Sequence, residues 1–226
     1  MARIAILGAS GVYGRHLAPR LVAAGHEVRA LVRRPEAAGI ARGCGADVRL
    51  ADIFDEASMA AAMEGCDVSI NLATSLPGPS GRGDYAVNDR VRREGAPIWL
   101  RACARAGVAR VIQQSIAMVN AAGEQLADED TPPGPVGNPL SAAAIQATID
   151  MEAAVRARSA DLGLDWVILR GGLFYGPGTG FDDDWFVRAA AGKLRMPGDG
   201  GEFVSLVHIS DMAAATVKAV ERWPSR

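Results

Sequence analysis

Three glycines near the start of the chain constrain its fold more than any other feature. Gly8, Gly11 and Gly14 lie in the segment GASGVYG, directly after the short apolar run 3–7 and before a stretch with helical spacing of apolar residues. Glycine permits a tight turn and a close approach of two backbones, so this order predicts a strand, a turn and a helix packed against the strand. A strand followed at once by a helix is the first half of a βαβ unit, which builds a parallel sheet.

The rest of the chain repeats this alternation of strand-like and helix-like segments. Short apolar runs are typical of parallel strands that are buried on both faces. Strands joined by helical crossovers predict an α/β fold: a Rossmann-type, doubly wound and mainly parallel sheet with helices on both faces. A chain of 226 residues is long enough for one such domain, spanning residues 1–226. The predicted strands are 3–7, 27–32, 47–50, 67–72, 108–113, 165–169 and 203–207, and the predicted helices are 13–24, 58–63, 98–106, 141–162 and 210–222, the last with Ser210 as its N-cap.

Three long segments interrupt this rhythm, at about 74–84, 120–140 and 171–201. Each follows a predicted strand, and therefore lies at the carboxyl edge of the sheet, where open α/β sheets bind their ligands. The segments are longer than simple connections need to be. We expect them to build a small, loop-based substrate pocket.

Composition excludes several classes of partner. The net charge is −2, so no electrostatic argument favours nucleic acid or an anionic membrane. The N-terminus enters a strand without a leader and no apolar run reaches the length of a membrane span, so a cytoplasmic location is the expectation. Cys44, Cys66 and Cys103 lack metal-ligand spacing, and their odd number argues against a disulfide framework, so we expect neither disulfides nor a metal site.

The glycine-rich turn has the properties of a dinucleotide-binding site. A helix N-terminus offers unpaired N–H groups and the positive end of its dipole, both of which favour a pyrophosphate. The spacing here is G-x-x-G-x-x-G rather than G-x-G-x-x-G, and a tight turn without a ligand is the alternative interpretation. The predicted cofactor contacts in this segment are Gly8, Ser10, Gly11, Val12, Tyr13 and Gly14.

Two arginines stand where the second predicted strand ends. An NAD site commonly has Asp or Glu near this point to bind the ribose 2′-hydroxyl. This chain has Arg33 and Arg34 instead, and a guanidinium suits a 2′-phosphate because it is permanently charged and binds in a fork. We therefore expect NADP (NADPH) to be preferred over NAD. The alternative is that both arginines are solvated surface residues.

Further motifs follow in order along the whole chain. They are Ala51-Asp52-Ile53 after the third strand, Asn71-Leu-Ala-Thr74 after the fourth, LRGGLFYGPG at 169–178 and VHISD at 207–211. Together with GASGVYG, this set resembles the extended or atypical short-chain dehydrogenase/reductase superfamily, in its NAD-dependent epimerase/dehydratase branch. The resemblance implies the superfamily's fold and its dependence on NAD(P).

The resemblance also implies roles for individual residues. Asp52 and Ile53 would contact the adenine, and Ala73 and Thr74 would line the path of the ribose and pyrophosphate. The segment 171–175, including Gly171 and Leu173, would border the nicotinamide.

One motif of this family is missing. Its members usually carry Tyr-x-x-x-Lys-x-x-x-Glu on the helix after the fifth strand. Matching the glutamate to Glu152 puts Ala144 at the tyrosine position and Thr148 at the lysine position. Alanine has no proton to donate, and threonine has no charge to lower the pKa of a phenol or to hold the ribose.

Two residues remain as candidates for catalysis. Ser115 follows the fifth strand, where the family has a Ser or Thr, although a shift of one residue would put Ile116 there. Tyr175 is the best remaining phenol, with a packing role as the alternative. Ser115, Gln114 or Tyr175 would polarise a carbonyl, with water as the source of the proton.

Three functions therefore stay open. The first is an NADP-dependent oxidoreductase that acts on a small carbonyl or hydroxyl compound with an atypical catalytic site. The second is a non-catalytic NADP-binding sensor or partner-binding protein. The third is an epimerase, dehydratase or lyase that retains the nucleotide. In each enzymatic case the partner is a small-molecule substrate, and the Ala-rich helix 141–162 predicts a homodimer because small residues permit close helix packing.

Overall fold

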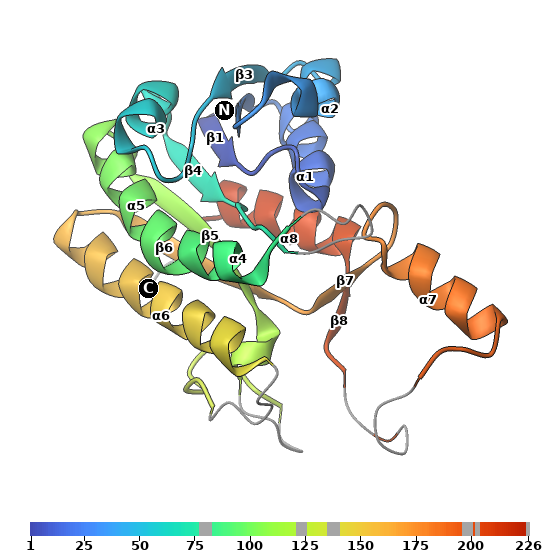
Figure 1. Ribbon diagram of the computed structural model, residues 1–226. Coiled ribbons are helices and arrows are strands. Elements are labelled where there is room, and N and C mark those ends of the chain that lie inside the picture. Colours follow the sequence, from blue (N-terminus) through green and yellow to red (C-terminus); the bar gives the residue numbers. More distant parts are fainter. Residues whose placement is uncertain (77–82, 121–125, 135–140, 196–200, 202–203, 225–226) are drawn as a thin grey trace.

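A computed structural model describes residues 1–76, 83–120, 126–134, 141–195, 201 and 204–224 of the protein. Its main sheet has six parallel strands in the order β3-β2-β1-β4-β5-β6 (Figure 1). The chain runs outward from β1 in one direction and then from β4 in the other, so the switch point lies between β1 and β4. The strands are β1 (Arg3–Leu7), β2 (Glu27–Val32), β3 (Asp47–Leu50), β4 (Val68–Asn71), β5 (Arg110–Ile116) and β6 (Asp165–Gly171).

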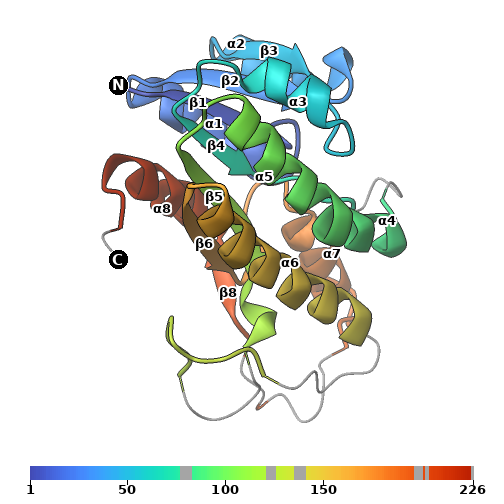
Figure 2. The same cartoon turned by 90° about the vertical axis from the view of Figure 1, so that its left-hand side faces the viewer.

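Helices cover both faces of this sheet. One face carries α1 (Val12–Ala23), the short α2 (Gly39–Gly43) and α8 (Ile209–Glu221). The other face carries α3 (Glu56–Met63), α4 (Tyr85–Arg90), the π-helical turn η2 (Val91–Gly95), α5 (Ala96–Arg105) and α6 (Ala142–Asp161), and Figure 2 shows α5 and α6 side by side. Two single turns, η1 (Pro35–Ala38) and η3 (Ala117–Val119), are also helical. The predicted doubly wound, Rossmann-type α/β fold is confirmed.

Alternating side chains of the strands build two hydrophobic layers. On β1, Ile4 and Ile6 face α1 and α8, whereas Ala5 and Leu7 face α3 and α5. The second layer contains the fully buried Trp99, whose indole N–H donates to Ser69 Oγ at 2.8 Å. Both layers are continuous with the sheet, so they hold the carboxyl ends of the strands in fixed positions.

The apolar runs located the six strands of the main sheet and most helices to within about three residues. Two boundaries differ for a physical reason. The predicted helix 98–106 begins earlier, because α4, η2 and α5 form one continuous helical segment, with the π-helical turn η2 directly before Pro97. The prediction of Ser210 as an N-cap is wrong, because His208 caps α8 and its ring nitrogen accepts the Ser210 N–H.

The segment 171–201 is not the irregular loop that we expected. It contains β7 (Leu173–Tyr175) and α7 (Phe181–Ala190). β7 pairs in parallel with β8 (Leu206–His208) in a separate two-stranded sheet. Of the strand predicted at 203–207, residues 206 and 207 belong to β8, residues 204 and 205 are not strand, and residue 203 lies outside the described residues. The strands meet closely at Gly172, where a Cβ would lie 2.4 Å from the Ser205 carbonyl oxygen.

Parts of the predicted pocket loops lie outside the described residues. These are 77–82 in the first loop, 121–125 and 135–140 in the second, and 196–200 in the third. Among the helices of the described residues, none combines the length and apolar character needed to cross a membrane.

Candidate functional site

The turn between β1 and α1 requires its glycines for steric reasons. Gly8 has φ +79°, and a Cβ there would lie 2.8 Å from the carbonyl group of Leu72 on the neighbouring chain segment. A Cβ on Gly14 would lie 2.5 Å from the Ala9 carbonyl oxygen. The turn is therefore packed tightly against β4 and against the first turn of α1.

Helix α1 presents its N-terminus at this turn. Gly11 is its N-cap, and no side chain caps the helix. The first turn contains no acidic residue, so the partial positive charge of the helix end is not offset locally. Together with the close-packed glycines, this is the arrangement that binds a pyrophosphate.

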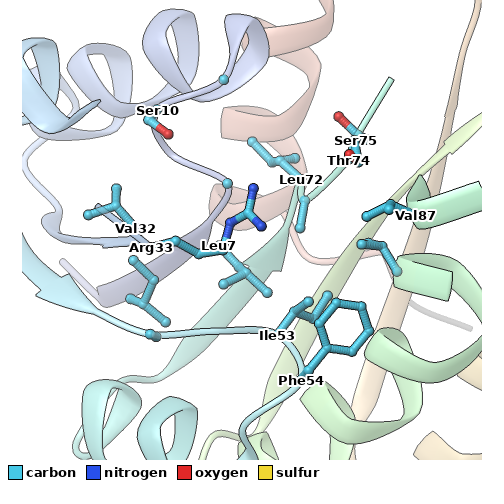
Figure 3. Close-up of a pocket in the computed structure, with 16 residues that line it drawn as sticks. Leu7, Ser10, Val32, Arg33, Ile53, Phe54, Leu72, Thr74, Ser75 and Val87 are labelled. Carbon is cyan, nitrogen blue, oxygen red and sulfur yellow. The ribbon is translucent and has the colours of Figure 1, made fainter. Parts of the chain in front are cut away.

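A cavity opens beside this turn, at the switch point between β1 and β4 (Figure 3). It is bounded by the turn after β1, by the ends of β2 and β4, by the segment after β3 and by α4 and η2. The structure brings many of the predicted cofactor residues together here: Gly8, Ser10, Gly11, Arg33, Ile53, Ala73 and Thr74.

Arg33 is the one charged residue that lines this cavity within the described part of the chain. It is exposed and follows directly on Val32, the last residue of β2. Figure 3 shows its side chain directed into the cavity, with Phe54 and Val87 on the opposite side. The electrostatic potential of the cavity therefore favours an anionic ligand.

Other predicted residues lie next to the cavity without lining it. Val12 and Gly14 belong to the first turn of α1, and Arg34 is an exposed residue that precedes η1. The Asp52 carboxylate accepts the Phe54 N–H at 2.9 Å, so it shapes the turn that presents Ile53.

Tyr13 points away from the cavity. Its hydroxyl hydrogen-bonds to Thr216 and to the Met212 carbonyl oxygen on α8. Burial raises the pKa of this phenol far above its ordinary value. Only the backbone of Tyr13, in the first turn of α1, is left to contact a ligand.

Sequence reasoning missed much of the cavity wall. The clearest signal was available on α4 and η2, where Val87 and Val91 are spaced by one helical turn. The guanidinium carbon of Arg90 lies 5.0 Å from the centroid of the Phe54 ring. This cation–π contact holds Phe54 in place in the cavity wall. The other missed lining residues are Leu7, Leu31, Val32, Ala51, Leu72 and Ser75.

Ser115 lies at the end of β5 in a buried polar network. The residue is 2% exposed, and its hydroxyl donates to Glu152 Oε1 at 2.6 Å. Arg170 on β6 donates to both oxygens of the same carboxylate, from Nε at 2.9 Å and from Nη2 at 2.7 Å. The hydroxyl proton of Ser115 is thus engaged by α6, and the network joins β5, α6 and β6.

The carboxylate of Glu152 is buried, and hydrogen bonds from Arg170 and Ser115 stabilise its negative charge. Burial alone would raise the pKa of Glu152, but the hydrogen bonds from Arg170 and Ser115 outweigh burial and lower the pKa. Arg170 Nη1 also donates to Asn120 Oδ1 at 2.8 Å, which ties the segment after β5 to the network.

Tyr175 lies in a different place, on β7. It is 39% exposed, and its ring meets that of His208 edge-on with centroids 5.1 Å apart. His208 Nδ1 accepts the Ser210 N–H, so the proton of the neutral imidazole resides on Nε2. No contact joins Tyr175 to Ser115 in the described part of the chain, so the two catalytic candidates do not form a pair.

Gly171 and Leu173 mark the passage from β6 to β7. Gly171 is buried, and a Cβ there would lie 2.8 Å from the ring of Phe174. The Leu173 N–H donates to the Ser205 carbonyl oxygen at 2.7 Å. Both residues lie at the carboxyl end of β6, and neither lines the cavity beside β1.

Helix α6 carries the positions matched to the missing pair. Thr148 is fully buried, and its hydroxyl donates to the Ala144 carbonyl oxygen at 2.8 Å. No group of three or more His, Cys, Asp or Glu side chains within the described ranges is arranged to hold a metal ion.

The sequence and the fold are similar to those of known proteins. The sequence model of the NAD dependent epimerase/dehydratase family matches residues 4–225. A 3-diazoavenalumate denitrifying reductase of a Streptomyces species is 36% identical over 232 residues, covering 97% of this chain and 72% of that protein. A 4-hydroxy-2-methyl-3-oxo-4-farnesyl-3,4-dihydroquinoline-1-oxide ketoreductase of Stigmatella aurantiaca is 29% identical, covering 98% of this chain and 65% of that protein.

Solved structures extend the comparison of the fold. The UDP-glucose 4-epimerase of Thermus thermophilus, in complex with NAD, superposes with a TM-score of 0.76 and 24% sequence identity. The match covers 96% of this chain and 74% of the epimerase, and at this identity it supports the fold alone.

Proposed function

The chain belongs to the NAD-dependent epimerase/dehydratase family, and from this membership we propose that it is an NADP-dependent oxidoreductase with an atypical catalytic site. Its substrate is a small molecule that gains or loses a hydride at a carbonyl or hydroxyl carbon. Family membership and the reductases among its relatives support the general oxidoreductase role.

The cavity at the switch point carries this proposal. Its glycine turn leaves no room for a Cβ at Gly8 or Gly14, and the uncapped end of α1 faces the same space, so these residues fit a dinucleotide pyrophosphate. Ile53 and Phe54 provide apolar surface for an adenine. Arg33, at the end of β2, supports a 2′-phosphate and hence NADP over NAD.

When bound, the nicotinamide supplies the hydride, and the protein must position the acceptor and manage its proton. Ser115 is engaged by Glu152, so its role is to position the end of β5 unless substrate displaces that hydrogen bond. Tyr175 keeps an exposed phenol beside the imidazole of His208. We assign the proton donation for a carbonyl acceptor to Tyr175 or to a water molecule that it orders.

A second class of acceptor is favoured by the residues at the matched positions. The Streptomyces relative is named for denitrifying reduction of a diazo compound. An aryl diazonium ion accepts a hydride at carbon and releases N₂, with no proton required for charge balance. Ala144 and Thr148 provide no phenol and no cation, and such a reaction does not depend on either.

One set of assays separates these proposals. The protein is mixed with NADPH and with aldehydes, ketones, quinones and an aryl diazonium salt, and oxidation of NADPH is followed by absorbance. Turnover supports the oxidoreductase. Binding of NADPH without turnover on any acceptor favours the NADP-binding sensor, and cofactor that copurifies and is never consumed favours the epimerase, dehydratase or lyase.

The Tyr175→Phe variant identifies the proton donor in the same assay. It is expected to slow carbonyl reduction by about 10²-fold or more, the usual contribution of a general acid. Reduction of the diazonium salt stays unchanged. Equal rates of carbonyl reduction by the wild-type protein and this variant would leave water as the donor.

A further inference from the structure

The small sheet of β7 and β8 turns only one of its faces toward the hydrophobic core. Phe174 on β7 and Val207 on β8 lie side by side, and both pack against that core. Side chains alternate between the two faces of a sheet, so the residues before and after this pair point the opposite way. We call this outward surface the β7–β8 face. Its residues within the two strands are Leu173, Tyr175, Leu206 and His208.

The β7–β8 face exposes apolar side chains to solvent. Leu206 is 52% exposed and Tyr175 is 39% exposed. Val204, two residues before Leu206, continues the alternation and is 58% exposed, so it also belongs to the face. None of the five side chains of the face carries a permanent charge. Exposed apolar side chains that gather in one place are typical of a binding surface.

One hydroxyl of defined orientation lies at the end of this apolar surface. The Tyr175 ring meets the His208 imidazole edge-on, and the imidazole is itself held in place. Its Nδ1 accepts the Ser210 N–H, and a Cβ on Gly176 would lie 2.4 Å from its Nε2, so the backbone packs closely on its other side. The Tyr175 hydroxyl forms no hydrogen bond with the residues that the structure describes, so it is available to a ligand.

The dimensions of the β7–β8 face decide what it can bind. Each strand has three residues, so the face is about 10 Å long and about 5 Å wide. A stable protein interface buries about 800 Å² on each partner, which is far more than this surface provides. Two fused aromatic rings match these dimensions, and a flat ring system packs well on aliphatic side chains. The face therefore suits a small aromatic molecule rather than a second copy of the chain.

We propose that the β7–β8 face binds the acceptor of the reaction and selects an aromatic compound. The ring system lies on Leu173, Val204 and Leu206, and the carbonyl oxygen of the acceptor accepts a hydrogen bond from the Tyr175 hydroxyl. This inference rests on the proposed function, because it takes Tyr175 as the group that meets the acceptor. It adds the class of substrate, which the cofactor cavity does not specify.

Two aldehydes test this selection in the presence of NADPH. 2-Naphthaldehyde has the fused rings, whereas glyceraldehyde is small and polar. In Leu206→Ser, the KM for 2-naphthaldehyde is expected to rise about tenfold through loss of apolar contact, with kcat within about twofold of the wild-type value. Both constants for glyceraldehyde stay within about twofold of the wild-type values. The matched control is Ile40→Ser on α2, a residue that is 48% exposed, and it leaves both aldehydes unaffected.

A binding measurement separates recognition from chemistry. The alcohol product, 2-naphthalenemethanol, is titrated by calorimetry into protein that is saturated with NADP. Leu206→Ser is expected to weaken this binding about tenfold, and Leu206→Met, which restores an apolar side chain, recovers most of the affinity. If Leu206→Ser does not fold, Val204→Ser decides by the same criterion, since Val204 lies outside the strands.

The other outcomes have separate meanings. Equal losses for the two aldehydes, or no loss for either, would overturn the inference. A dimer that Leu206→Ser converts to a monomer, with unchanged KM for 2-naphthaldehyde, would assign the face to a second copy of the chain and also overturn it. A wild-type protein that oxidises NADPH with no acceptor would reject the proposed function itself, whereas turnover that is insensitive to Leu206 and Val204 would reject this inference alone.

Discussion

Arg33 is the side chain to which the proposed preference for NADP is assigned. It lines the cavity at the end of β2, whereas Arg34 is exposed and does not line it. The sequence singled out both arginines equally, because the two residues are adjacent and chemically identical. Only the fold distinguishes them, since successive residues at the end of a strand point in different directions.

The Arg33→Ala variant is therefore predicted to lose affinity for NADPH by about tenfold or more and to keep its affinity for NADH. The physical reason is the loss of charge-assisted hydrogen bonds to the 2′-phosphate, which NADH lacks. Isothermal titration calorimetry with both coenzymes measures the effect. Arg34→Ala is the control, with a smaller change, and a parallel loss of NADH binding in Arg33→Ala would contradict the assignment.

The hydrogen-bond partner of Ser115 could not be predicted from the sequence. Its place after a predicted strand made it a catalytic candidate. The partner of its hydroxyl, Glu152, is separated from it by 37 residues along the chain and approaches only when α6 packs on β5 and β6. Glu152 itself was identifiable from the family motif, but its pairing with Arg170 depends on the register of two strands.

Glu152 predicts a specific dependence of stability on pH. Its pKa is lower in the folded chain than in the unfolded one, so its carboxylate stabilises the fold above the ordinary glutamate pKa of about 4.3. That contribution is lost as the pH falls through the lower, folded-state pKa. Denaturant unfolding as a function of pH should show a decline in the wild-type protein that is absent in Glu152→Gln.

The same variant leaves Arg170 without its buried partner charge. We expect Glu152→Gln to reduce the free energy of unfolding at neutral pH by about 3–5 kcal/mol. Glu56→Gln, which breaks the partly exposed pair with Arg101, is the control and should cost about 1 kcal/mol or less. Similar costs for the two variants would show that the network around Glu152 contributes little.

At the scale of elements, the strand–turn–helix unit of β1 and α1 was predictable because its requirements are steric and local. The helix α7 was not. Its apolar residues Trp185, Phe186 and Val187 are consecutive in the sequence and exposed, so they form no stripe along one face that packs on a core. The strands β7 and β8 are short, and their pairing joins segments that are far apart in the sequence.

The close packing of α1 against the turn makes Gly14 a test of this unit. A Cβ in Gly14→Ala would lie 2.5 Å from the Ala9 carbonyl oxygen, so the turn and the end of α1 must move apart. We predict a lower melting temperature and NADPH affinity reduced by at least about tenfold. Gly43→Ala is the control, because Gly43 lies in a helix with open space around it. This variant should lower neither the melting temperature nor the affinity for NADPH. Unchanged NADPH binding in Gly14→Ala would separate the turn from the cofactor site.

At the scale of the whole molecule, the parallel sheet order explains why one cavity collects residues from distant parts of the chain. The carboxyl ends of β1, β2, β3 and β4 meet at one edge, so the turn residues after each of them face the same space. This arrangement was predictable from the alternation of strands and helices. The geometry of the segment after β6, which carries the proposed catalytic residue Tyr175, was less predictable, because it depends on the second sheet formed by β7 and β8.

Association of two chains through α6 is also a prediction at this scale. Its exposed surface includes Ala153, Ala157 and Ala160, which are spaced along one side of the helix and permit close approach of a second copy. Light scattering should give the mass of a dimer for the wild-type protein and of a monomer for Ala157→Arg. A monomeric wild-type protein would remove this prediction without affecting the cofactor site.

The proposed function is the transfer of a hydride from NADPH to a small acceptor. The most direct test uses NADPH that carries deuterium at the transferring carbon, with mass spectrometry of the product and of the coenzyme. If the proposal is correct, deuterium appears at the reduced carbon of the product while NADP is formed. NADPH that binds and returns unoxidised, with no deuterium in any acceptor, would contradict it.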